Sequence, residues 1–415
     1  MIGRWFALLF VLVALPFGAA NAAVPPSAEG TYVIPSFAFR DGETLANLRM
    51  HYATLGTPRR GATGRVTNAV LVLHGTGGDT HQFLREQFAG VLFNAGQTLD
   101  AATYFIIIPD GIGHGKSSKP SDGLHARFPH YGYRDMVDAV HAVLVDGLHV
   151  DHLRLVMGTS MGGMQTWLWG ETYPMMMDAL MPLASLPQQI GGRNRIWRDM
   201  IVDDIKDDPG YYGGEYNAQP YGLRTAVDML YVFGSAPLYN QTQYPTRDTA
   251  DAYYEKTVKP RIAGLDANDT IYQFEASRDY DPEPALATIV APLQAVNSAD
   301  DQINPPELGH PRARHRARQE RQSGRPADHE LDARPWHAHV ASRLGLVPHR
   351  FAGAQRRLGP PLPARHGRFR CATIFYLGTN LLPFIARRFE DESPALFVSF
   401  GPLYRCARHF VDQTR

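Results

Sequence analysis

The feature that most constrains the fold of this chain is one serine between glycines, placed where a strand pattern gives way to a helix pattern. Residues 156–167 read VMGTSMGGMQTW. The apolar run 153–157 precedes the serine, and a helical pattern over 164–173 follows it until Pro174. A Gly-x-Ser-x-Gly motif between a strand and a helix is typical of a nucleophile elbow. Ser160 is therefore the candidate nucleophile.

A nucleophilic serine needs a base for its proton, and amide donors for the oxyanion that forms on the attacked carbonyl. The amide of Met161, at the start of the predicted helix, is one candidate donor. The second is expected in HGTGG (74–78), the loop after an earlier predicted strand, where Thr76 is the candidate. His74 comes before this turn, so we expect it to shape the loop rather than to act as the base.

Further apolar runs alternate with helical stretches along the chain, and this alternation predicts the fold class. The runs are 69–73, 104–108, 153–157, 179–183 and 289–296. Such a pattern predicts an α/β fold with a mostly parallel central sheet and helices on both faces. An antiparallel pair is predicted over 31–55, and the less regular segment 187–285 is predicted to be an inserted helical cap. The alternative for that segment is an elaborate surface of the sheet domain.

The acid that orients the base should follow the serine, at the end of a later strand. The segment NSADDQINPPELG (297–309) places Asp300 and Asp301 there. Pro305 and Pro306, just beyond, restrict the backbone and favour a rigid loop that aims one carboxylate inward. The alternative is an ordinary turn with two solvated carboxylates.

The stretch DGIGHGKSS (110–118) offers a competing interpretation. It follows a predicted strand and ends in Gly-Lys-Ser, as a phosphate-binding loop does. That motif requires a glycine where this chain has Asp110, and Pro120 interrupts the helix that should follow. These two departures argue against nucleotide binding.

The ends of the chain and its composition limit where the protein works and what it binds. Residues 1–22 have the pattern of a signal peptide, with a basic start, a short apolar stretch and small residues before Ala23. We expect a periplasmic or secreted protein with no stable membrane span after cleavage; an uncleaved anchor is the alternative. The 415 residues carry no formal net charge, which argues against a nucleic-acid partner. No Cys/His cluster with zinc spacing occurs in the first three hundred residues, and no metal or cofactor is expected.

Five blocks occur in order and carry a resemblance to a known family. They are HGTGGD, GTSMGGMQTWLWGETYP, RNRIWRDMIVDDIKDDPGYYGGEY, DANDTIYQF and NSADDQINPPELG. Together, from roughly Thr31 to Gly309, they resemble the homoserine O-acetyltransferase-like branch of the α/β-hydrolase superfamily. The resemblance implies an α/β-hydrolase fold with a helical cap, Ser160 as nucleophile, Asp301 as the triad acid, and a homodimer. Two features depart from the acetyltransferases proper: an exported protein would not meet cytosolic acetyl-CoA, and the family's Gly-His motif, some thirty residues past the acid, is missing.

The composition changes abruptly after Gly309. Residues 311–370 contain fourteen arginines and no lysine, which as a charge run would indicate a disordered or nucleic-acid-binding tail. High-GC coding sequence read out of frame also yields Arg, Pro, Ala and His. The genetic code allows ARPWHAH (333–339), shifted by one base, to read Arg-Gly-His-Gly-Thr-His. We therefore hypothesise a one-base frameshift near Gly309, so that 310–415 is an aberrant, poorly ordered segment.

Under this hypothesis the catalytic histidine is lost, because its codon straddles Pro335 and Trp336. His337 and His339 remain as candidate bases, outside the expected context. The leading prediction is an exported serine hydrolase that acts on a small-molecule acyl ester through an acyl-enzyme on Ser160, impaired by the missing histidine. An O-acyltransferase of the homoserine O-acetyltransferase type and a catalytically inactive relative are the alternatives.

Overall fold

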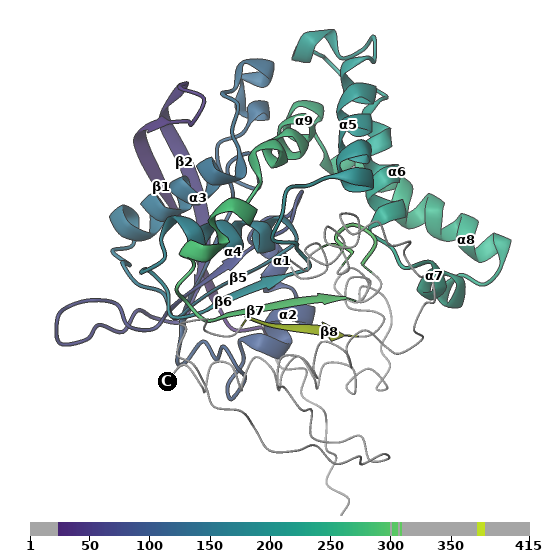
Figure 1. Cartoon of the computed structure of the whole chain (residues 1–415). Coiled ribbons are helices and arrows are strands. Elements are labelled where there is room, and N and C mark those ends of the chain that lie inside the picture. The colour runs from purple at the N-terminus through teal and green to yellow at the C-terminus, as the bar shows by residue number, and fades with distance from the viewer. Residues whose placement is uncertain (1–23, 299–300, 306–307, 309–371, 378–415) are drawn as a thin grey trace, which may run out of the picture.

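The computed structural model describes residues 24–298, 301–305, 308 and 372–377 (Figure 1). Its centre is one sheet, whose described strands run in the order β1-β2-β4-β3-β5-β6-β7-β8. β2 pairs antiparallel with both β1 and β4, and all other neighbours are parallel, as the alternation of apolar runs and helices predicts. The strands are β1 (Ser27–Ala38), β2 (Thr44–Leu55), β3 (Ala69–Leu73), β4 (Phe105–Pro109), β5 (Leu155–Thr159), β6 (Leu180–Leu183), β7 (Leu293–Ser298) and β8 (Ala372–Leu377).

Helices connect the strands and cover both faces of the sheet. The described α-helices are α1 (His81–Leu84), α2 (Glu86–Leu92), α3 (Tyr133–Ala142), α4 (Met161–Thr172), α5 (Gly192–Lys206), α6 (Leu223–Phe233), α7 (Pro237–Gln243), α8 (Arg247–Tyr253) and α9 (Ala267–Glu275). α5 to α9 all lie between β6 and β7, in the segment where the sequence predicts a cap. In Figure 1, α5 to α8 lie on the side toward which the arrowheads of β6 and β7 point.

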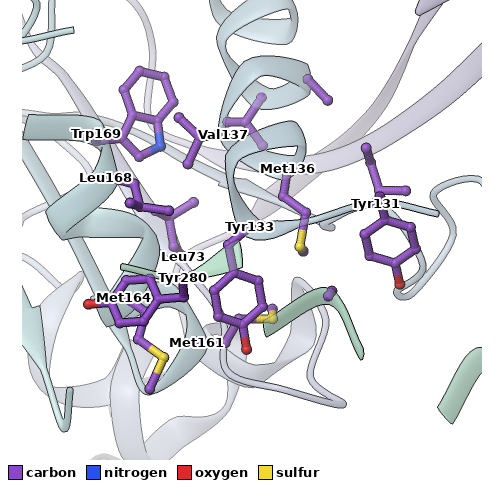
Figure 2. Packing of buried hydrophobic residues seen from close by; sticks show 14 of the residues in the cluster. Leu73, Tyr131, Tyr133, Met136, Val137, Met161, Met164, Leu168, Trp169 and Tyr280 are labelled. Atoms are coloured by element: carbon purple, nitrogen blue, oxygen red, sulfur yellow. The ribbon is translucent and has the colours of Figure 1, made fainter. Parts of the chain in front are cut away.

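Alternate side chains of β3 pack against opposite layers of helices. Leu71 and Leu73 belong to a buried cluster that includes residues of α3 and α4, whereas Val70 and Val72 belong to a second cluster with residues of α1 and α2. Successive side chains of a strand point to opposite faces, so a strand covered on both faces must be apolar at every position. Figure 2 shows part of the first cluster, in which Leu73 lies among Tyr133, Met136, Met161, Met164 and Leu168.

One predicted boundary was wrong by a few residues. The run 289–296 was expected to be a strand throughout, but β7 begins only at Leu293. Pro292 has no N–H to donate to a strand neighbour, and a 3₁₀ helix over Glu283–Thr288 comes shortly before it. Helix α4 begins at Met161, immediately after the serine, where the sequence places the start of the helix, and the periodic pattern 164–173 lies largely within it.

β8 falls inside the segment 310–415 that the sequence predicts to be aberrant. Its backbone pairs in parallel with β7 over six residues, from Leu293 opposite Ala372 to Ser298 opposite Leu377. The other residues of that segment, and residues 1–22, lie outside the described part of the chain. The frameshift and the signal peptide therefore stay predictions.

Candidate active site

Ser160 occupies a strained turn between a buried strand and a helix. All five residues of β5 are buried, and α4 starts at the next residue, Met161. Ser160 has φ 55° and ψ −114°, a region that residues with a side chain rarely adopt and that costs of order 1–3 kcal/mol. Its N–H donates to the carbonyl of Leu183 on β6 at 2.9 Å, which holds the turn at the sheet edge. This is the geometry expected of a nucleophile elbow.

The glycines on either side of Ser160 are required by close packing. A Cβ on Gly162 would lie only 2.1 Å from the carbonyl oxygen of Leu73 on β3. A Cβ on Gly158 would lie 2.4 Å from the carbonyl group of Gly162 itself. Neither contact involves a side chain that could move away, so the strand-to-helix turn closes only with glycine at both positions.

The two candidate oxyanion donors come from elements next to the serine. Met161 is the first residue of α4, where a helical N–H has no carbonyl partner within the helix. The loop after β3 lies against the serine, because a Cβ on Gly75 would be 3.6 Å from the Cβ of Ser160. Thr76 follows Gly75 directly, and its Oγ1 is buried with no hydrogen-bond partner among the described residues. The structure thus brings Met161, Thr76 and Ser160 into one region.

His74 is buried and bonded to backbone through both ring nitrogens. Its Nδ1 lies 2.9 Å from the carbonyl oxygen of Gly75, and its Nε2 lies 3.0 Å from the amide nitrogen of Gly111. Burial lowers the pKa of His74 below its ordinary value. With neither nitrogen available to the serine, this histidine shapes the loop, as the sequence suggests.

Asp301 follows β7, two strands away from β5 in the sheet. Asp301 is buried, and its Oδ1 accepts hydrogen bonds from the backbone N–H groups of Ile303 at 2.9 Å and Asn304 at 2.8 Å. Two backbone amides on one carboxylate oxygen fix the orientation of the side chain. Asp300, the other acidic candidate, lies outside the described residues.

Helix α5 of the cap holds the loop that carries Asp301. Asn194 Nδ2 donates to the carbonyl of Ile303 at 3.0 Å and contacts Oδ1 of Asn304 at 3.2 Å. Asn304 in turn donates from Nδ2 to the carbonyl of Ala184, just after β6, at 2.9 Å. Side chains therefore join the cap, the acid loop and the end of β6. Neither asparagine was predicted from the sequence.

The described residues provide no hydrogen-bonded base for Ser160. Within them, no hydrogen bond of the Ser160 hydroxyl is found. The candidates His337 and His339 lie outside the described part of the chain. Residues 378–383, directly after β8, read GTNLLP and contain no histidine.

In the loop that resembles a phosphate-binding motif, the carboxylate of Asp110 occupies the space inside the turn. Asp110 is buried, and it accepts the backbone N–H of Thr80 at 2.6 Å and that of Lys116 at 2.8 Å. A Cβ on Gly115 would lie 2.2 Å from Oδ2 of Asp110. His51 Nδ1 adds a contact to Asp110 at 2.7 Å, and the ammonium of Lys116 pairs with Glu29. The backbone N–H groups of this loop that would bind a phosphate thus already donate to acceptors within the protein.

A buried arginine near the site escaped sequence reasoning. Arg198 of α5 lies with its guanidinium 5.1 Å from the ring centre of Trp197 and 5.5 Å from that of Phe274. Burial lowers its pKa, and the hydroxyl of Tyr133 is near. The Tyr133 hydroxyl contacts the guanidinium of Arg198, and neither Nη1 of Arg198 nor that hydroxyl has another hydrogen-bond partner among the described residues. Tyr133 and Met161, the residue after the serine, belong to the same buried cluster (Figure 2).

Two other kinds of feature are absent from the described residues. No group of three or more His, Cys, Asp or Glu side chains in them is arranged to hold a metal ion. No helix in the same part of the chain is long and apolar enough to cross a membrane.

Comparisons with known proteins agree with this geometry. The family model of the alpha/beta hydrolase fold matches residues 68–322. The chain is 26% identical to homoserine O-acetyltransferase from Haemophilus influenzae, over 64% of this chain and 81% of that protein. Among solved structures, homoserine O-acetyltransferase from Bacillus anthracis shares its fold with a TM-score of 0.67 and 18% identity, over 93% of this chain and 98% of that one. An acetylester hydrolase from Corynebacterium glutamicum shares it with a TM-score of 0.66 and 16% identity, over 93% of this chain and 96% of that one.

These similar proteins are esterases and acyltransferases, and the chain is an enzyme of this kind. The resemblance seen in the sequence and the fold it implies are therefore confirmed. The family model covers more than half of the chain, from just before β3 to beyond β7. This chain belongs to the alpha/beta hydrolase fold family.

Proposed function

We propose that this chain is an exported serine hydrolase that cleaves acyl esters through an acyl-enzyme on Ser160. The observation that carries the proposal is the backbone of Ser160. A non-glycine residue at φ 55° between a buried strand and a helix needs a reason, because the same turn with glycine would be free of strain. Presenting a hydroxyl at a helix N-terminus, beside amide donors, is such a reason.

The reaction follows from the groups around the serine. Ser160 Oγ attacks the ester carbonyl while a base takes its proton, and the N–H groups of Met161 and Thr76 stabilise the oxyanion. The tetrahedral intermediate then collapses: the base gives its proton to the leaving alkoxide oxygen, which departs as the alcohol. The acyl group stays on Oγ. Water then attacks the acyl-enzyme by the same route, which releases the carboxylic acid and restores the serine.

Asp301 is proposed as the acid that orients the base. The base is the group that this chain is proposed to lack. We propose that a frameshift near Gly309 removed the family histidine, and that His337 or His339 replaces it poorly. Activity of the chain as written should then be low. Sequencing the gene across codon 309 tests this: an unaltered frame in the source DNA contradicts it.

A second function, O-acyl transfer to a small acceptor, is favoured by one observation. Apart from their contact with each other, Nη1 of Arg198 and the Tyr133 hydroxyl have no partner among the described residues, and they offer donors at a buried position, where a guanidinium suits a carboxylate. An acceptor that bears a carboxylate would use them, and the similar homoserine O-acetyltransferases have such an acceptor in homoserine.

One set of assays separates the candidates. Purified full-length chain is given p-nitrophenyl acetate in one arm, and acetyl-CoA with or without homoserine in the other. Ester hydrolysis that disappears in Ser160→Ala supports the hydrolase. Homoserine-dependent acetyl-CoA consumption that exceeds hydrolysis contradicts it in favour of transfer. No turnover in either arm indicates an inactive relative.

Export and assembly are separate parts of the proposal. Residues 1–22 are proposed as a cleaved signal peptide, so secreted protein should begin at Ala23 by intact mass. A soluble cytosolic product that retains Met1 contradicts export. A homodimer is proposed from the resemblance alone, and the mass in solution by light scattering tests it.

A further inference from the structure

The loop after β3 is held by side chains on both peptide groups that flank Gly75. On one side, the N–H of Gly75 donates to Oε1 of Gln82 at 3.0 Å. On the other, the carbonyl oxygen of Gly75 lies 2.9 Å from Nδ1 of His74 and accepts the N–H of Gly78, also at 2.9 Å. The backbone of Gly75 is therefore bonded at its N–H and, twice, at its carbonyl.

The hydrogen bonds of His74 define its tautomer. The N–H of Gly111 can only donate, so Nε2 of His74 must be the acceptor of that 3.0 Å bond. Nδ1 then carries the proton and donates it to the carbonyl of Gly75. The ring is neutral, and burial, which lowers its pKa, keeps it so at ordinary pH.

The planarity of the peptide bond links this bond to the oxyanion. The carbonyl of Gly75 and the N–H of Thr76 belong to one peptide group, and in a trans peptide they point in opposite directions. Two donors fix the carbonyl toward His74 and Gly78, so the N–H of Thr76 must point the other way. Donors on a carbonyl also polarise the group and strengthen its N–H as a donor.

We propose that His74, together with Gln82, is a positioning residue that aims the Thr76 N–H at the oxyanion formed on attack by Ser160. The inference rests on the proposed function, because it needs Ser160 to be the nucleophile. Gly75 is placed for this role, since a Cβ on it would lie 3.4 Å from the carbonyl oxygen of Thr159 and 3.6 Å from the Cβ of Ser160. His74 touches neither substrate nor serine; it acts through the backbone.

The test compares His74 with a matched neighbour. His114 is equally buried, and its ring centre lies 5.0 Å from that of His74, but its Nδ1 bonds only to the carbonyl of Ile112. Full-length His74→Leu, His74→Asn and His114→Leu are treated with a fluorophosphonate, and intact mass follows the rate of Ser160 modification. Thermal unfolding of the same variants shows how much each change costs the fold.

His74→Leu should slow modification by about 10- to 100-fold, since full loss of one oxyanion donor costs about 100- to 1,000-fold. With p-nitrophenyl acetate the loss should fall on kcat with KM little changed. His74→Asn should recover much of the rate, because its amide can donate to Gly75 in the place of Nδ1. His114→Leu should stay within about threefold of wild type. An equal loss in both leucine variants, or none in His74→Leu, overturns the proposal.

The failure of the proposed function gives a different result. Fluorophosphonate label that persists in Ser160→Ala rejects Ser160 as nucleophile. The ¹⁵N spectrum of histidine-labelled protein still tests His74 in that case. A neutral Nδ1–H ring from about pH 5 to 8 is expected. An Nε2–H tautomer contradicts the hydrogen bond from Nδ1 of His74 to the carbonyl of Gly75.

Discussion

The two sides of the candidate site are built in different ways. The nucleophile side consists of Ser160 and the loop after β3, and its geometry follows from glycines close in sequence and from backbone hydrogen bonds. The acid side depends on side chains distant in sequence, since Asn194 of α5 bonds to Ile303 across 109 positions. The comparison teaches that the turn at the nucleophile is encoded by glycines next to it in sequence, whereas the acid side exists only once the cap has packed on the core.

The largest effect is expected at the centre of the nucleophile side. Ser160→Ala should remove ester hydrolysis almost to the level of buffer, because the proposed acyl-enzyme forms on the hydroxyl that is lost. Loss of the nucleophile in another serine enzyme costs about a million-fold in kcat. Steady-state hydrolysis of p-nitrophenyl acetate measures it, with circular dichroism as the control for folding. Full activity in this variant would reject the elbow assignment.

The next effect tests the acid side. Asp301→Asn should lower kcat by more than Asp300→Asn does, because Oδ1 of Asp301 is fixed by two backbone amides at a buried position. The corresponding change in another serine enzyme costs about ten-thousand-fold, and the loss here should stay below that of Ser160→Ala. Both variants are compared in the same esterase assay. Equal losses would show that the choice between the two carboxylates has no basis.

This contrast explains how much the sequence predicts. The parallel sheet, the helices on both faces and the strained Ser160 follow from apolar periodicity and from a short glycine motif, so they were predicted. Arg198 and Asn194 were missed, because nothing in a helical pattern shows which polar side chain will be buried against another element. The hydrogen-bonding state of His74 depends on Gly111, 37 positions away, and no local pattern contains it.

A smaller effect tests whether the cap holds the acid loop. Asn194→Ala removes the bond to the Ile303 carbonyl and the contact with Asn304, and leaves Nε of Arg198 without its acceptor, 2.9 Å away. An unsatisfied buried group costs about 1–3 kcal/mol, so the melting temperature should fall by several degrees. Hydrolysis should fall by about tenfold through a looser Asp301. Asn217→Ala, on the same cap but away from this loop, is the control.

A fall in stability without a fall in kcat would separate the cap from the acid. In that case Asn194 would serve folding alone, and the rigidity of the acid loop would have to come from Pro305 and from Asn297, which donates to the carbonyl of Asn304 at 2.7 Å. The acid loop would then hold its geometry without the cap.

The smallest effect concerns α4 itself, at the end opposite Ser160. Glu171 is buried with one oxygen unpartnered among the described residues, and burial raises its pKa to about 7 despite Arg134 at 3.2 Å. A raised pKa adds stability that is complete below the ordinary value of 4.5 and is lost as the pH rises through 7. Because Arg134 is partly exposed to water, the loss should be roughly 1–2 kcal/mol rather than the full shift. Unfolding in urea at pH 5.5 and 8 should show this loss in wild type and little of it in Glu171→Gln. If kcat also changed in that variant, the far end of α4 would be coupled to the nucleophile, and the site would be less locally encoded than the glycines indicate.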